Sequence, residues 1–144
     1  MKASVAVVVS RFNEEVTSRL SERCLATLKA NGVQRARVIR VPGAYELPWA
    51  AQELALSKRY AVVIALGCVI KGDTEQNRHI SRSVIQALQH VALLTRVPVI
   101  LGVITPDTRA QALLRTRGKL DRGREAALAA LEMLALRREL AHGA

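Results

Sequence analysis

Aromatic side chains are scarce in this sequence, whose 144 residues include one phenylalanine, one tryptophan and two tyrosines. Proteins that bind single-stranded nucleic acid stack bases on such rings, so the scarcity weakens a role of that kind. No apolar run approaches the roughly 18 residues that a membrane-spanning helix needs, which excludes such a helix. The short apolar stretch near the N-terminus is followed by Arg11 and an acidic pair rather than by a small-residue cleavage site, which argues against a signal peptide.

Cysteine and histidine are also few. Cys24 and Cys68 both lie in apolar patterns, so we expect two buried thiols in a reducing cytoplasm rather than a disulfide framework. The three histidines, His79, His90 and His142, are too scattered to form a ligand set, and no cysteine–histidine spacing predicts a metal site. The glycine motifs of dinucleotide-binding domains and the serine elbow of hydrolases are absent as well.

Acidic residues are outnumbered by basic ones, 12 against 22, which gives a formal net charge of +10. The main local concentration is residues 109–124. An excess of this kind favours an anionic partner, either nucleic acid or a phosphorylated small molecule. A solvated basic surface is the alternative interpretation, and charge alone does not separate the two.

What the sequence does contain is a regular alternation of apolar runs and helical patterns. Residues 4–9 (SVAVVV) are typical of a strand buried on both faces. Val16, Leu20, Cys24 and Leu28 recur every four residues and give one apolar helix face, for which Asn13 is the expected N-cap. Further strands are expected at residues 36–41, 61–67 and 98–104, and further helices at about 47–57, from a turn at 72–74 to 95, 107–115 and 122–136.

Four strand–helix alternations predict a parallel sheet with helices on both faces. We therefore expect an α/β fold, a three-layer α/β/α sandwich of the flavodoxin-like kind with a four-stranded parallel sheet, formed by a single domain over residues 1–144. Ligands of such folds collect at the carboxyl ends of the strands. The loops of interest are therefore 10–13, 42–46, 68–76 and 105–108.

The first two of these loops carry a ring and a carboxylate. Phe12, the only phenylalanine, lies just past a strand end, where it is either a platform for a planar ligand or a core residue. Glu46 lies between two prolines and is either a partner for hydroxyl or amino groups or an exposed turn residue. Gly43 lets a ligand approach the backbone closely.

The other two loops carry features that suit an anion. A glycine turn leads into a helix after residue 68, where backbone N–H groups, Lys71 and Thr74 are candidate phosphate donors, although the P-loop spacing is absent. Arg115, Lys119 and Arg122 follow the last loop, and arginine binds phosphate in a bidentate fork. A solvated basic face is again the alternative. Cys68 is interpreted as a core residue.

Six sequence blocks occur together in one order: S-R-F-N at 10–13, V-P-G-A-Y-E-L-P at 41–48, A-L-G-x-V-I-K-G-D-T at 65–74, V-P-V-I-x-G-V-I-T-x-D-T at 97–108, Q-A-x-x-R at 111–115 and R-G-x-E-A-A-x-A-A-L-E-M at 122–133. In this order they resemble the lumazine synthase (6,7-dimethyl-8-ribityllumazine synthase) family over nearly the whole chain. The resemblance implies a cytoplasmic, cofactor-free transferase of riboflavin biosynthesis. The family condenses 5-amino-6-(D-ribitylamino)uracil with 3,4-dihydroxy-2-butanone 4-phosphate and releases phosphate and water. It also implies self-association into pentamers, with each site between adjacent subunits, and in some members a sixty-subunit shell.

The resemblance implies roles for residues at matching positions. The pyrimidine ring stacks on Phe12, the ribityl chain contacts Ala44 and Glu46, and the uracil meets the backbone of Val69 and Ile70. The phosphate loop comprises Gly72, Asp73 and Thr74. Arg115 reaches from the neighbouring subunit and binds the same phosphate, and Arg122 replaces a family lysine nearby. Leu101 is a further expected binding residue, at a position where an aromatic residue is usual.

The chain departs from the family at the residue that transfers protons. A histidine is usual at the position of Gln76, and glutamine cannot shuttle protons near neutral pH. His79 lies three residues further on, on the same helix face, and is a candidate substitute about one turn deeper. We therefore expect a lumazine synthase of reduced activity. The alternative is a catalytically silent assembly or ligand-binding protein with the same fold, and a nucleic-acid partner is disfavoured.

Overall fold

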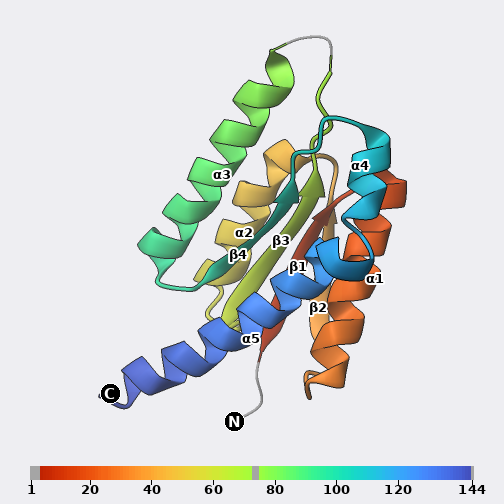
Figure 1. The fold of residues 1–144 in the computed structure, drawn as a ribbon. Coiled ribbons are helices and arrows are strands. Elements are labelled where there is room, and N and C mark those ends of the chain that lie inside the picture. Colours follow the sequence, from red (N-terminus) through yellow and green to blue (C-terminus); the bar gives the residue numbers. More distant parts are fainter. Residues whose placement is uncertain (1–3, 73–74, 144) are drawn as a thin grey trace.

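The computed structural model describes residues 4–72 and 75–143, and within them strands alternate with helices (Figure 1). The strands and helices follow in the order β1 (Val5–Ser10), α1 (Glu14–Ala30), β2 (Ala36–Val41), α2 (Leu47–Leu56), β3 (Val62–Cys68), α3 (Gln76–Thr95), β4 (Val99–Ile104), α4 (Arg109–Leu114) and α5 (Arg122–Ala141). Two short 3-10 turns, Ala44–Glu46 and Gly118–Leu120, precede α2 and α5.

The four strands form one parallel sheet in the order β2-β1-β3-β4. The central strands β1 and β3 are buried at every residue, because helices cover both faces of the sheet. This explains why their sequences are continuous apolar runs rather than alternating ones. The expected three-layer sandwich with a four-stranded parallel sheet is confirmed.

Helices α1 and α5 cover one face of the sheet, and α2 and α3 cover the other (Figure 1). The predicted face of α1 is confirmed, since Val16, Leu20, Cys24 and Leu28 are all buried. Helix α5 crosses α1 closely at Gly123, where an added β-carbon would come 2.4 Å from the backbone oxygen of Leu20. Only glycine allows that approach.

Asn13 differs from its expected role. It does occupy the N-cap position of α1, but its backbone is left-handed, with φ 64°, and its side chain makes no capping hydrogen bond. Its amide Nδ2 instead donates to the carbonyl oxygen of Cys68 at 3.0 Å. The capping prediction was wrong because a partner 55 residues away in sequence takes the side chain, which pins the start of α1 to the end of β3.

The remaining differences concern helix ends. The last helix continues to Ala141, five residues beyond the expected end near 136, because leucine, arginine and glutamate in this stretch all favour helix. Helix α4 begins at Arg109 because the Thr108 hydroxyl accepts a hydrogen bond from Gln111 N at 3.1 Å. Within the described ranges, no helix is both long and apolar enough to cross a membrane.

Candidate functional site

The loops that follow β1 and β2 are joined to each other at the carboxyl end of the sheet. Backbone N–H groups of Arg11 and Phe12 both donate to the Pro42 carbonyl, at 3.1 and 2.9 Å. The segment after β3 is held in the same way by the segment after β4. Val69 N donates to Ile104 O at 2.9 Å and Lys71 N to Pro106 O at 3.0 Å. All four loops predicted to carry the site therefore lie at one end of the sheet.

A cavity of about 330 Å³ opens between the first three of these loops and the start of α3. We call it the Phe12 pocket. It is lined by Phe12, Asn13, Gly43, Ala44, Tyr45, Glu46, Cys68, Val69, Ile70, Gly72, Gln76, Asn77 and Ile80. It thus brings together seven of the predicted site residues: Phe12, Ala44, Glu46, Val69, Ile70, Gly72 and Gln76. Asp73 and Thr74 lie outside the described residues.

Phe12 and Glu46 are both arranged around Gly43. The Phe12 side chain is 65 % exposed, so the interpretation of this residue as core is wrong. Its ring lies against Gly43, whose backbone N–H donates to Glu46 Oε1 at 2.9 Å. Glu46 is half-buried, and this bond fixes one of its carboxylate oxygens. The pocket therefore offers a flat apolar face beside an oriented acceptor, a combination that suits a planar ring with a polar chain.

Gln76 and His79 lie in the first turn of α3 but in different surroundings. Both are exposed, but Gln76 lines the Phe12 pocket and His79 does not. The first position presents a neutral amide to a ligand. The imidazole of His79 is not part of the pocket lining.

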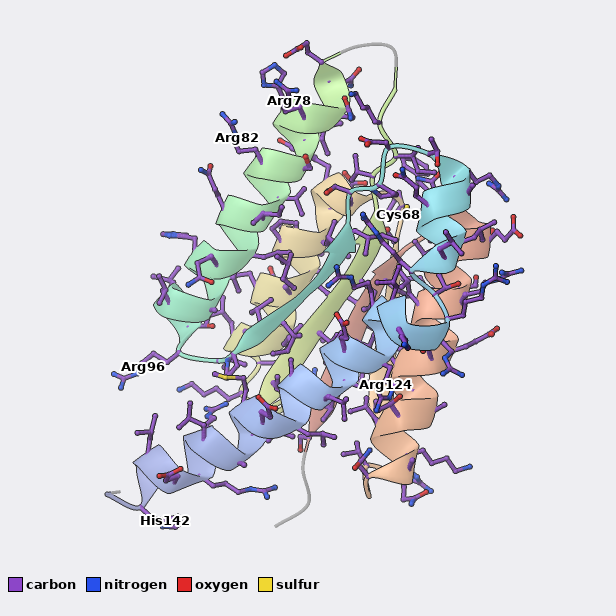
Figure 2. All side chains as sticks on the ribbon, viewed as in Figure 1. Cys68, Arg78, Arg82, Arg96, Arg124 and His142 are labelled. Atoms are coloured by element: carbon purple, nitrogen blue, oxygen red, sulfur yellow. The ribbon has the colours of Figure 1, made fainter. Side chains whose placement is uncertain are left out.

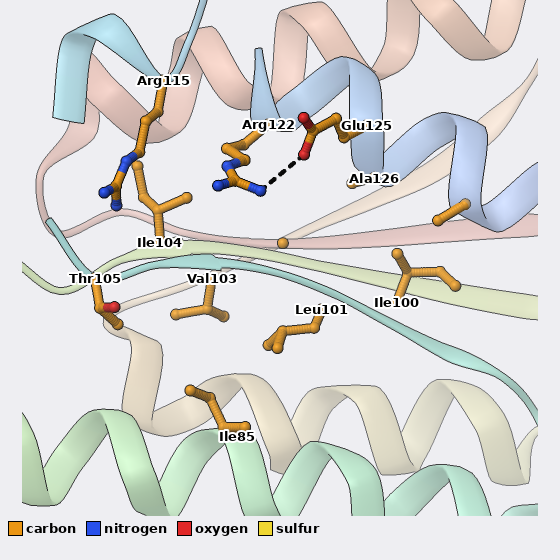
Figure 3. Close-up of a pocket in the computed structure, with 12 residues that line it drawn as sticks. Ile85, Ile100, Leu101, Val103, Ile104, Thr105, Arg115, Arg122, Glu125 and Ala126 are labelled. Atoms are coloured by element: carbon orange, nitrogen blue, oxygen red, sulfur yellow. Dashed lines mark hydrogen bonds and ion pairs between the residues drawn. The ribbon is translucent and has the colours of Figure 1, made fainter. Parts of the chain in front are cut away.

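Leu101, Arg115 and Arg122 line a second cavity, of about 430 Å³, which we call the arginine pocket (Figure 3). It lies between β4, the start of α5 and Arg115, the residue that directly follows α4. Its other lining residues are Ile85, Ile100, Gly102, Val103, Ile104, Thr105, Glu125, Ala126 and Ala129. Arg122 Nη1 pairs with Glu125 Oε2 at 2.9 Å, and Arg122 N donates to Arg115 O at 2.7 Å. Two guanidinium groups thus share one cavity, which suits a phosphate.

Cys68 lies near both pockets, at the carboxyl end of β3 (Figure 2). Burial raises the pKa of its thiol to about 11, against a smaller lowering effect of the positive charge of Arg115. The thiol is therefore neutral at physiological pH and is not a ready nucleophile. The core interpretation of Cys68 agrees with its 3 % exposure.

Among the described residues, none lines both pockets. One chain therefore carries the predicted ring-binding and phosphate-binding residues as two separate sets. Lys119, the remaining basic candidate, is exposed and lines neither cavity. Nor does any group of three or more His, Cys, Asp or Glu in the described part of the chain suit a metal ion.

Sequence reasoning missed several lining residues, among them Asn13, Tyr45, Asn77 and Glu125. The sequence could have indicated Glu125, because it lies three residues after Arg122 on one helix, a spacing at which opposite charges pair. It could also have indicated Tyr45, which lies between Ala44 and Glu46 in the block at residues 41–48.

The positive charge is distributed over several elements rather than gathered on one groove. Arg78, Arg82 and Arg96 extend along α3, and Arg124 lies on α5 (Figure 2). All four are exposed. This distribution favours the solvated basic surface as the interpretation of the net charge, with the two arginines of the arginine pocket as the exception.

Comparison with known proteins identifies the family of the chain. The family model described as 6,7-dimethyl-8-ribityllumazine synthase matches residues 2–138. A protein of that name from Parasynechococcus marenigrum is 47 % identical over 146 residues, covering 95 % of this chain and 89 % of its own. Another from Thermococcus gammatolerans is 40 % identical over 136 residues, covering 94 % and 88 %. The chain therefore belongs to the 6,7-dimethyl-8-ribityllumazine synthase family.

Proposed function

We propose that this protein is the transferase of riboflavin biosynthesis that condenses 5-amino-6-(D-ribitylamino)uracil with 3,4-dihydroxy-2-butanone 4-phosphate to form 6,7-dimethyl-8-ribityllumazine. The observation that carries the proposal is the division of the predicted binding residues between the Phe12 pocket and the arginine pocket. We propose further that residues 1–144 act as one domain in the cytoplasm, where the two buried thiols stay reduced.

The aminouracil belongs in the Phe12 pocket. The exposed ring of Phe12 gives the pyrimidine a stacking surface. Ala44 and the Glu46 carboxylate face the ribityl hydroxyls, and the backbone of Val69 and Ile70 supplies hydrogen-bonding groups for the uracil edge. Gly72, at the rim, begins the segment that we assign to the phosphate of the second substrate, together with Asp73 and Thr74.

The phosphate of the second substrate also needs the arginine pocket. Arg115 and Arg122 are the positive charges of that cavity, and a neighbouring copy brings them to the Phe12 pocket in this proposal. Leu101, in the same cavity, then closes the apolar side of the shared site. A site divided in this way is complete only where two copies meet.

Two different surfaces of the chain support such a contact. The first, which we call the aromatic patch, consists of Phe12, Tyr45 and Trp49, each at least 65 % exposed. The second, which we call the β4 groove, is a largely apolar channel beside β4, lined by Leu93, Pro98, Leu101 and Met133 among others. It shares Leu101 with the arginine pocket.

Because the two surfaces differ, the contact is head-to-tail, and head-to-tail contacts form a ring when their rotation closes. We propose a pentamer, as the family resemblance implies, and regard a sixty-subunit shell as its further assembly. The groove continues into the site, so assembly and substrate binding use one interface.

The chemistry asks the site mainly to hold two reactants together. The amino group of the uracil attacks the ketone carbonyl, and water leaves as the imine forms. Phosphate is then eliminated, and the ribitylamino nitrogen closes the ring on the resulting carbonyl with loss of a second water to give the lumazine. Juxtaposition alone supplies a large part of such an acceleration. Gln76 hydrogen-bonds but does not transfer protons, and loss of a general acid–base costs about 10² to 10⁴ in rate. We therefore propose reduced turnover.

Turnover tests this proposal directly. The purified protein, mixed with both substrates, should form fluorescent lumazine above the uncatalysed rate. Gln76→His should raise kcat, while Gln86→His, at an exposed position of the same helix, should not. His79→Ala should leave kcat unchanged if His79 transfers no proton, and a large fall would make His79 the substitute acid–base.

A second candidate function rests on Gln76 alone. A catalytically silent assembly or ligand-binding protein would keep the fold and the pockets without the proton-transfer residue. Background turnover in both the natural protein and Gln76→His, with ligand binding retained, would favour this candidate over the enzyme.

A further inference from the structure

Asp121 is a nearly fully buried carboxylate, 2 % exposed, at the N-terminus of α5. Its Oδ2 accepts a hydrogen bond from Arg23 Nε of α1 at 2.6 Å. Its Oδ1 accepts one from Arg124 N at 2.9 Å, which caps the helix. One side chain therefore joins two helices, through a partner 98 residues away in sequence, and both of its oxygens are occupied.

The same turn fixes the two arginines of the arginine pocket. Arg122 directly follows Asp121, and its backbone N–H donates to the Arg115 carbonyl at 2.7 Å. Gly123 is packed against the backbone of Leu20 on α1, too closely to admit a β-carbon. The start of α5 is thus held in place against α1, and the backbones of both arginines are held with it.

We propose that Arg23 and Asp121 are positioning residues for Arg115 and Arg122, and that they set the affinity for the phosphorylated substrate. The inference rests on the proposed function for the identity of that substrate. Arg23 contacts no residue of the Phe12 pocket in the hydrogen bonds and ion pairs described, so the aminouracil is unaffected.

The pairing matters because the Asp121 carboxylate is buried, while its partner Arg23 reaches it from a half-exposed position on α1. Removing Arg23 leaves the Asp121 carboxylate buried without its counter-charge, and such a group rearranges or draws in other cations. The cations closest to Asp121 along the chain are Arg122 and Arg124. Binding of one phosphate by two guanidinium groups needs them held in a fixed relation, so a small displacement of the turn weakens binding.

Arg23→Met and Asp121→Asn test the inference in the full-length protein. Asparagine is as good an N-cap as aspartate, so Asp121→Asn removes the charge and keeps the cap. We expect each variant to raise KM for the butanone phosphate roughly fivefold or more, with KM for the aminouracil and kcat unchanged. Arg23→Lys should recover part of the loss. Arg19→Ala, which removes an exposed ion pair elsewhere on α1, is the matched control and should alter neither KM.

A second measurement does not depend on turnover. Inorganic phosphate should raise the thermal unfolding temperature of the natural protein and of Arg19→Ala, and raise it less in Arg23→Met and Asp121→Asn. If the natural protein makes no lumazine, the proposed function fails, and the phosphate shifts still decide this inference. Equal shifts in all four proteins, or no shift in any, would overturn it. So would two KM values that rise together.

Discussion

The ring of Phe12 lies so close to Gly43 that a β-carbon at position 43 would come 2.7 Å from ring carbon Cδ2. Gly43 also donates its N–H to Glu46. A single glycine therefore sets the position of both groups that we assign to the aminouracil.

Gly43→Ala should displace the Phe12 ring, because no relaxed contact exists at that distance. We expect a rise in KM for the aminouracil and a loss of unfolding free energy smaller than the about 1–3 kcal/mol of an overpacked core, because the exposed Phe12 ring has room to move. Steady-state kinetics and urea unfolding measure the two effects. Combining Gly43→Ala with Phe12→Leu should recover the stability but not the KM. An unchanged KM in Gly43→Ala would separate the ring from substrate binding.

Ser10→Ala should stabilise the protein. The Ser10 hydroxyl is buried, and its oxygen has no hydrogen-bond partner among the described residues. Burying a polar group without a partner costs free energy, so its removal should add roughly 1 kcal/mol to the free energy of unfolding. Thr116→Val is the control with the opposite sign, since the Thr116 hydroxyl donates to Leu113 O at 2.7 Å. Destabilisation by Ser10→Ala would reveal a partner for that hydroxyl.

Much of the fold followed from local pattern, whereas two side chains are positioned by distant partners. Strands β1 and β3 are uninterrupted apolar runs, and the four-residue spacing of Val16 to Leu28 marks one face of α1. Neither pattern needs a distant partner. Asn13 and Asp121, by contrast, are both positioned by residues far away in sequence, Cys68 and Arg23. No local signal carries that information.

The candidate site shows the same division. The rule that parallel sheets bind ligands at strand ends located Phe12, Glu46 and Gly72 in one pocket. It did not separate that pocket from the one that holds Arg115, because strand order and helix packing decide which loops share a cavity. From the sequence, only the family resemblance implied that Arg115 and the residues of the Phe12 pocket come from different subunits.

Stability should fall above about pH 9 through the two buried thiols. Burial raises the pKa of Cys24 to about 12, with a further increase from the Asp121 charge, and that of Cys68 to about 11. Both values lie above the ordinary 9.0, so the folded state binds these protons more tightly than the unfolded state. The thiol contribution is complete below pH 9 and is lost as pH rises toward 11 and 12.

Unfolding free energies between pH 8 and pH 10.5 measure this loss. The Cys24→Ala/Cys68→Ala variant is the reference, since every other titrating group remains in it. The natural protein should lose stability more steeply than the reference over that range. Parallel curves would show that the thiols titrate normally.

Trp49 should report assembly, because it is the only tryptophan and is 68 % exposed in the single chain. Burial at a subunit contact shifts tryptophan emission to shorter wavelength. We expect blue-shifted emission in the assembled protein and a red shift on dilution. Trp49→Glu, which lacks the fluorophore, should show weakened assembly as a smaller sedimentation coefficient. Leu56→Glu, on the same helix but outside the aromatic patch, is the comparison. Fully exposed emission from an assembled protein would exclude this patch from the contact.

The most direct test of the shared site is complementation between two inactive variants, Phe12→Ala and Arg115→Ala. When they are coexpressed and assemble at random, about a quarter of the head-to-tail contacts should pair an intact Phe12 pocket with an intact arginine pocket. Lumazine formation should then return to roughly that fraction of the natural rate. Phe12→Ala coexpressed with the double variant Phe12→Ala/Arg115→Ala should stay at background. If the two single variants together are no more active than each one alone, the site is not shared between copies.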